Sequence, residues 1–147
     1  MKALITSVIG AMNTAITGGT LSAARVYKGF QGNPEEIPRK FFPYVAIDEQ
    51  GERTAEDGVN SETAVNRIYS VGIEFAVWKN DIEAALDAIL DLSNQVRTVI
   101  ELQANRFKDS HIWGIAIRPF EWIQEEKYFF RGRQVTVEYY DLQDRYN

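Results

Sequence analysis

Residues Arg67–Trp78 carry the pattern that most limits how this chain can fold. Apolar side chains occupy every second position from Tyr69 to Val77, and small or polar residues stand between them. Successive side chains of a β-strand point to opposite sides, so this spacing predicts a strand with one buried and one half-polar face. Asn80 and Glu83 follow as a capping-box pair, which predicts that a helix begins directly after the strand.

Two amphipathic helices are predicted. Residues 1–17 carry apolar side chains at helical spacing, and Gly18-Gly19 ends that pattern. The second helix is expected from Asp81 to about Ala104, with its acids concentrated in the N-terminal half, where the helix dipole favours them. The side chains expected to form its core stripe are Ile82, Leu86, Ile89, Val96, Val99 and Ile100.

Four further strands are expected from the spacing of apolar residues and turn signals. They are Arg25–Phe30, Phe41–Asp48, Ile112–Arg118 and Tyr128–Tyr140, the last bent at Gly132. Strands joined by short loops, with the helices set apart, indicate one α+β domain over residues 1–147. We expect a mostly antiparallel sheet with two helices packed on one face, plus a long hairpin or loop arm.

The expected arm, about residues 49–66, concentrates the negative charge of the chain. The whole chain has a net charge of −5 at pH 7, and the stretch from Asp48 to Glu62 alone accounts for all of it. This stretch is either a long loop or the tip of a long hairpin, and charge runs of this kind often mark a solvated segment. Because no basic face stands out elsewhere, the charge pattern argues against tight binding of a phosphate backbone.

Composition excludes several kinds of active site. There is no Cys and only one His, which removes disulfides, thiolate zinc sites and a multi-histidine metal site within one subunit. Asp109-Ser110-His111 is interpreted as a polar turn rather than a catalytic triad, and Glu125-Glu126 as solvated acids. We therefore expect no enzyme activity, no cofactor and no bound metal.

No apolar stretch approaches the ~20 residues that span a bilayer. Polar residues interrupt the apolar run at the N-terminus, so we expect a helix of an intracellular product there rather than a signal peptide. No membrane partner is expected.

Arg131 and Arg133 share one face of the last predicted strand with Phe129, which could stack on a nucleic-acid base. Without a wider basic groove, an edge-strand guard against aggregation or a salt bridge to a partner is the favoured interpretation. Many aromatic residues together with Arg are typical of interface cores. The candidate subunit or partner interface residues are Asp48, Glu49, Glu52, Arg53, Glu56, Asp57, Arg131 and Arg133.

Three segments together suggest a family. Pro43-Tyr44-Val45-Ala46-Ile47 opens a sheet after an N-terminal helix, and a strand of the Val71–Trp78 type runs directly into the Asp81–Leu102 helix. Val135-Thr136-Val137-Glu138-Tyr139 belongs to the C-terminal strand. In this order and size the chain resembles the tail terminator, or tail completion, proteins of long-tailed bacteriophages.

The resemblance implies a structural virion protein that forms a homo-oligomeric ring, typically a hexamer, at the head-proximal end of the tail. Such a ring ends growth of the tail tube and provides the docking surface for the head–tail connector or stopper protein. DNA passes through its lumen without specific binding, and assembly takes place in the host cytoplasm. The alternatives are another phage neck or tail-tube-related structural protein, a small cytoplasmic oligomeric α+β binding module, or an enzyme of unrecognised type.

Overall fold

The computed structural model describes residues 2–32, 36–54, 64–106, 112–117, 121–124 and 130–144 of the 147-residue chain, with side chains described in 2–32, 36–54, 67–102 and 132–141. In chain order the elements are α1 (Lys2–Thr17), β1 (Arg25–Lys28), the 3-10 helix η2 (Arg39–Phe41), β2 (Tyr44–Thr54), β3 (Ala64–Trp78), α2 (Ile82–Arg106), β4 (Ile112–Ile117), β5 (Glu121–Gln124) and β6 (Phe130–Asp144).

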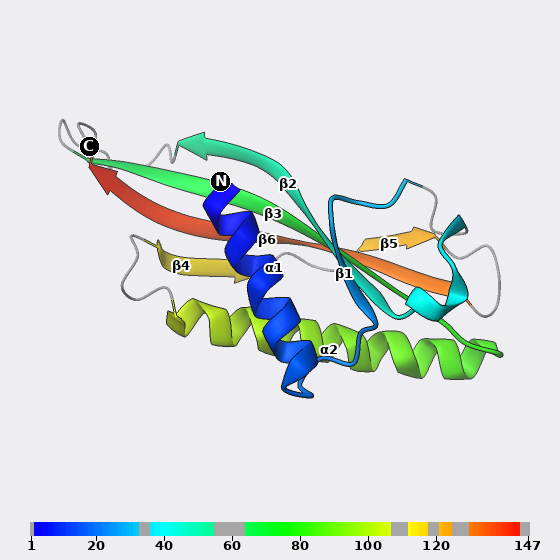
Figure 1. Cartoon of the computed structure of the whole chain (residues 1–147). Coiled ribbons are helices and arrows are strands. Elements are labelled where there is room, and N and C mark those ends of the chain that lie inside the picture. Colours follow the sequence, from blue (N-terminus) through cyan, green and yellow to red (C-terminus); the bar gives the residue numbers. More distant parts are fainter. Residues whose placement is uncertain are drawn as a thin grey trace.

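The strands form one twisted six-stranded sheet (Figure 1). The strand order across the sheet is β1-β2-β3-β6-β4. The sixth strand, β5, also pairs with β6 but is not part of this order. The β1–β2 pair is parallel, and the other pairs are antiparallel. The structure therefore confirms the predicted α+β class and the mostly antiparallel sheet.

Both helices pack on the same face of the sheet, here called the helix-side face. It is formed by the odd-numbered residues of β3 from Tyr69 to Val77 and by Val135, Val137 and Tyr139 of β6, which share one buried cluster with both helices. Figure 1 shows α1 crossing the sheet and α2 running beside it on this face. The prediction of two helices on one face is confirmed, because the alternation in β3 supplies the apolar surface on which they pack.

The opposite face, here called the loop-side face, is covered in part by the segment between β1 and β2. Tyr44, Ala46 and Ala76 form a second buried cluster there, against which Phe30 and the aromatic residues near η2 pack. At Gly72 an added Cβ would lie 2.6 Å from the Cζ of Phe30. A side chain at this position would therefore have to displace the ring of Phe30, and glycine lets the loop approach the strand so closely.

The predicted burial of α2 is correct for most of its stripe but wrong at the N-terminal end. Ile89 is fully buried, whereas Ile82 and Leu86 are 47% and 38% exposed. The buried positions instead recur at Ala85, Ile89 and Leu92 and continue toward the C-terminus. With 3.6 residues per turn, Leu86 lies about 100° around the helix axis from the buried Ala85. Leu86 and, one turn earlier, Ile82 therefore fall on the flank of the stripe.

The cap of α2 is also different from the prediction. Asp81, not Asn80, is the N-cap, since its Oδ1 accepts a hydrogen bond from the backbone N–H of Ala84 at 2.8 Å. The Oδ1 of Asn80 instead accepts a hydrogen bond from Nη2 of Arg39 at 2.6 Å. Both residue types are good N-caps, and here Asn80 joins the helix start to η2.

The strands of the arm are longer than predicted. β2 continues to Thr54, and Asp48–Thr54 pairs with β3, so residues 49–54 belong to a hairpin rather than a loop. β6 extends to Asp144, beyond the predicted end at Tyr140. It pairs with β3 without a register shift over these described residues, so the expected bend at Gly132 does not interrupt that ladder. Residues 55–63 lie outside the described residues.

The core predicts the response to two truncations. Phe75 on β3 and Ile89 on α2 are both fully buried in the same cluster, as the alternation and the helical stripe predict. Phe75→Ala should lower the free energy of unfolding by about 3–5 kcal/mol and Ile89→Ala by about 2–5 kcal/mol, because each leaves a cavity. Urea unfolding measures both, with Leu102→Ala as the control, because the Leu102 side chain is 53% exposed. A Phe75→Ala variant as stable as that control would contradict the assigned face of β3.

Candidate interaction surfaces

A β-bulge in β2 decides which faces carry the charges of the arm. Glu49 pairs with Val71, but Gly51 pairs with Ser70, so Gln50 is an extra residue in β2. Gly51 has a φ of 126°, a conformation that L side chains rarely adopt. One extra residue reverses the sidedness of a strand. After the bulge, even-numbered residues of β2 lie on the helix-side face and odd-numbered ones on the loop-side face.

The bulge places Glu52 and Arg67 together on the helix-side face. Nη1 of Arg67 lies 2.6 Å from Oε1 of Glu52, and both side chains are largely exposed. This hydrogen bond raises the pKa of Arg67. On the same face, burial and then the nearby Asp141 carboxylate raise the pKa of Tyr69, to which that carboxylate is hydrogen-bonded. On the helix-side face of the arm, Arg67 of β3 thus lies near carboxylates from both β2 and β6.

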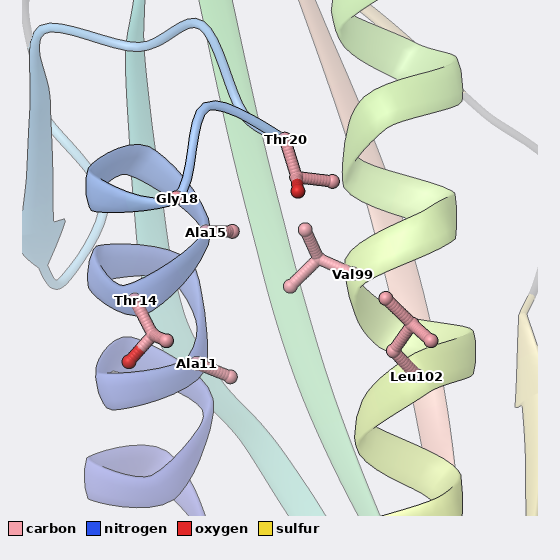
Figure 2. A pocket seen from close by; sticks show the side chains of 7 residues that line it. All are labelled: Ala11, Thr14, Ala15, Gly18, Thr20, Val99 and Leu102. Atoms are coloured by element: carbon pink, nitrogen blue, oxygen red, sulfur yellow. The ribbon is translucent and has the colours of Figure 1, made fainter.

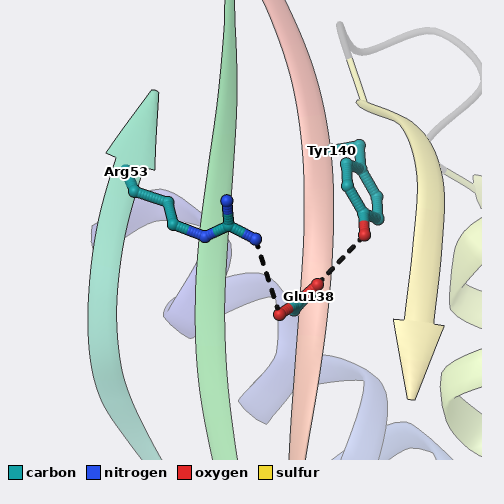
Figure 3. A network of polar contacts seen from close by, with 3 residues as sticks. All are labelled: Arg53, Glu138 and Tyr140. Carbon is teal, nitrogen blue, oxygen red and sulfur yellow. Dashed lines mark hydrogen bonds and ion pairs between the residues drawn. The ribbon is translucent and has the colours of Figure 1, made fainter. Parts of the chain in front are cut away.

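A second network lies on the loop-side face (Figure 3). Nη2 of Arg53 lies 3.9 Å from Oε1 of Glu138, and the hydroxyl of Tyr140 donates a hydrogen bond of 3.0 Å to Oε2 of the same carboxylate. Figure 3 shows Arg53 reaching from β2 across β3 to β6, with α1 behind the sheet. Glu138 is buried, and a buried carboxylate is costly unless such donors surround it. The network therefore joins β2 to β6 across β3.

Asp48 and Glu74 hold the loop that follows β1. Oδ2 of Asp48 accepts the N–H of Phe30 at 3.2 Å, and Oε2 of Glu74 accepts the N–H of Gln31 at 3.2 Å. Glu74 is only 5% exposed. Its burial, and secondarily the charge of Asp48, raise the pKa of the Glu74 carboxyl, while the bond from Gln31 opposes the rise. This pair of acids is part of the internal structure of the loop-side face.

The predicted interface residues therefore separate into groups. Glu49, Glu52 and Arg53 are exposed, whereas Asp48 is half-buried under the loop. Glu56, Asp57 and the side chain of Arg131 lie outside the described residues. The structure does not bring the described members together at one site, because the bulge divides Glu52 and Arg53 between the two faces.

The interpretation of Arg131 and Arg133 as an edge-strand guard is wrong. β6 lies between β3 and β4 in the sheet and is not an edge. Arg133 is half-buried and pairs in register with Phe75, on the same side of β6 as Val135 and Val137. The position of β6 depends on pairing with distant strands, which the local sequence of β6 does not reveal.

Two exposed surfaces were not recognised in the sequence. The first, here called the α2 ridge, comprises the exposed apolar residues Ile82, Leu86 and Leu90 with the adjacent acids Glu83 and Asp87. The second, here called the basic aromatic edge, comprises Arg25, Tyr27, Arg39, Lys40 and Phe41. Helical spacing places two of the ridge residues, Ile82 and Leu86, in the predicted core stripe, and Leu90 lies outside that stripe.

A hollow of about 190 Å³ lies between the helices (Figure 2). Its described lining residues are small or apolar, with the hydroxyls of Thr14 and Thr20, and none is titratable. Figure 2 shows Val99 and Leu102 directed from α2 toward the small residues of α1. Within the described part of the chain, no three His, Cys, Asp or Glu residues are placed to hold a metal ion.

Comparison with protein-family models and with curated proteins finds no match to this chain. In the described residues, neither helix is long and apolar enough to cross a membrane.

The buried Glu74 carboxyl predicts a pH-dependent stability. A carboxyl whose pKa is raised by folding favours the folded state when protonated, and this contribution is lost as the pH rises through the folded pKa. Glu74→Gln keeps an acceptor for Gln31 and removes the buried charge. The variant should have a higher free energy of unfolding than the wild type at neutral pH. This difference should shrink toward about pH 4, because the Glu74 carboxyl of the wild type is then protonated.

Urea unfolding at several pH values measures this difference. Glu49→Gln is the matched control, since it removes an exposed carboxylate from the same sheet and should change stability little. A Glu74→Gln variant that loses stability at neutral pH would contradict the assigned environment.

Proposed function

We propose that this chain is a structural protein of a bacteriophage virion, a tail terminator. In this role it forms a homo-oligomeric ring at the head-proximal end of the tail, and the ring is a hexamer. Tail-tube protein lies on one side of the ring, and a head–tail connector or stopper protein docks on the other. The role is one of assembly, with no catalytic step and no cofactor.

The order of the elements supports the proposal. The N-terminal helix α1 precedes the strand that opens at Tyr44, β3 leads into α2 with only Lys79–Asp81 between them, and β6 closes the sheet beside β3. These are the three segments on which the resemblance to tail terminators depends. The chain thus resembles tail terminators in the order of these elements as well as in the individual segments.

The single observation that carries the proposal is the extension formed by β2, β3 and β6. In Figure 1 the ends of β3 and β6 reach past the N-terminal end of α1, and Glu52–Thr54 of β2 are exposed there. The paired strands and the charge pairs Glu52–Arg67 and Arg53–Glu138 hold the extension together. Glu52–Thr54 and Arg67 are exposed on this projection, and an exposed, paired projection suits contact with neighbouring subunits.

The charge distribution suits a channel that lets DNA slide. Arg53 and Arg67 lie against carboxylates, and Arg133 is half-buried on the helix-side face. Among the described residues, the exposed cations Arg25, Arg39 and Lys40 gather at the basic aromatic edge, where each lies over an aromatic ring, and this edge is too short to follow a run of phosphates. Duplex binding depends on Lys and Arg that neutralise successive phosphates, so we expect negligible affinity for DNA. Acids near the lumen would repel the phosphates further.

Assembly in solution tests the proposal. Light scattering coupled to size-exclusion chromatography should show a ring-sized species that grows with protein concentration, and electron microscopy should show a closed ring. Added to polymerising tail-tube protein, the purified chain should stop tube elongation. At physiological salt, duplex DNA should bind more weakly than about micromolar.

The opposite outcomes select among the alternatives. A monomer or dimer at every concentration would favour the cytoplasmic binding module. A ring that leaves tube growth unchanged would favour another neck component. DNA binding at micromolar concentration or tighter would overturn the structural role in favour of a nucleic-acid module.

A further inference from the structure

We infer that the α2 ridge of one copy docks on the basic aromatic edge of a second copy, and that this head-to-tail contact builds the oligomer. The inference rests on the proposed ring and specifies its subunit contact. The occupant of the ridge is thus a second copy of this chain rather than a different protein.

The α2 ridge is apolar where a monomer would expose polar residues. Ile82, Leu86 and Leu90 are 47%, 38% and 42% exposed. Because they are spaced four residues apart, they form a continuous line along the helix surface. They lie on the flank of the buried stripe, so neither the sheet nor α1 covers them. Exposed apolar side chains that are contiguous rather than scattered mark an interaction surface.

The ridge is also strongly acidic. Between Asp81 and Asp91 the helix start has four acids and no base. Glu83 and Asp87 are exposed and lie beside the ridge on the helix surface. Two copies of this helix packed against each other would bring the acids face to face, and like charges at an interface oppose association. The ridge therefore requires a basic partner with apolar surface.

The basic aromatic edge has this chemistry. The guanidinium of Arg25 lies 4.8 Å from the ring centre of Tyr27 and 4.9 Å from that of Phe41, and Nζ of Lys40 lies 5.1 Å from the ring centre of Phe41. Arg25 and Lys40 are exposed, and both rings are half-buried. Cations held over aromatic rings keep their charge, and Arg with aromatic residues is enriched in interface cores.

Within one chain, most of each surface lies on its own side of the sheet. Tyr27 and Phe41 pack on the loop-side cluster with Tyr44, whereas α2 covers the helix-side face. The sheet separates the two surfaces, but both lie near the junction of β3 and α2, where Arg39 contacts Asn80. Contact between two different surfaces of identical chains is heterologous, and such contacts repeat around an axis until the ring closes.

Truncation of the ridge tests the apolar part of the contact. The double variant Leu86→Ser with Leu90→Ser should weaken assembly at least about tenfold in dissociation constant, measured by analytical ultracentrifugation. Leu102→Ser is the matched control, since Leu102 is 53% exposed on another side of the same helix. Equal effects of the two substitutions, or none from the double variant, would overturn the inference.

Reversal of charge tests the pairing itself. Glu83→Lys with Asp87→Lys makes the ridge basic, and Arg25→Glu with Lys40→Glu makes the edge acidic. Each variant alone should stay monomeric, because both of its surfaces then carry the same sign. Mixed in equal amounts, the two variants should assemble again, since every ridge then meets an edge of opposite charge. Failure of the mixture to assemble, with both chains folded by circular dichroism, would overturn the inference.

A milder variant covers the case in which a reversal prevents folding. Glu83→Gln with Asp87→Asn keeps the helix surface polar and removes its charge. Wild-type assembly should weaken as salt rises, and this neutral variant should lose most of that salt dependence. Salt dependence equal to that of the wild type would overturn the inference.

The experiments distinguish a failure of the proposed ring from a failure of the proposed contact. A wild-type chain that stays monomeric at every concentration overturns both the ring and this contact. A wild-type ring that the ridge and edge variants leave intact overturns only the contact.

Discussion

The ladder between β3 and β6 is the contact on which the rest of the structure depends. It joins Ala64–Trp78 to Phe130–Asp144 along their full lengths, although α2 and two strands lie between them in the chain. The two strands together supply most of the strand surface on which the helices pack, with Phe75 opposite Arg133 and Ile73 opposite Val135. Because β4 and β5 both pair with β6, the far half of the sheet also depends on this ladder.

One extra residue in β2 then determines how the charges are matched. With Gln50 inserted and Gly51 at positive φ, Glu52 faces Arg67 on one side and Arg53 faces Glu138 on the other. Without the bulge, Glu52 and Arg53 would exchange faces of the sheet. Arg53 would then lie on the side of Arg67, and the buried Glu138 would lose its cation. The bulge is therefore a requirement of the charge pairing, not a defect of the strand.

Local pattern was sufficient for the α+β class, for the facing of β3 and for the burial of Ile89, because strand and helix periodicities are properties of neighbouring residues. Local pattern was insufficient for the burial of a side chain or the position of a strand where these depend on residues far away in the sequence. Ile82 and Leu86 have the spacing of core residues, but the line along which the helix meets the sheet leaves them exposed. Likewise, nothing in the sequence around Arg133 shows that β6 is an internal strand. The bulge at Gln50 also depends on its pairing with β3.

This difference changes where recognition is expected. The arm looked like a free acidic surface, yet its described residues Asp48, Glu52 and Arg53 contact groups within the chain. Groups that already have internal partners gain less from a second chain, because a new contact must replace an existing one. Apolar side chains exposed in a row have no such internal contact to replace, and their burial is favourable in proportion to area. In the proposed ring, burial of the α2 ridge therefore adds more to the contact between subunits than new pairings of the charged groups of the arm.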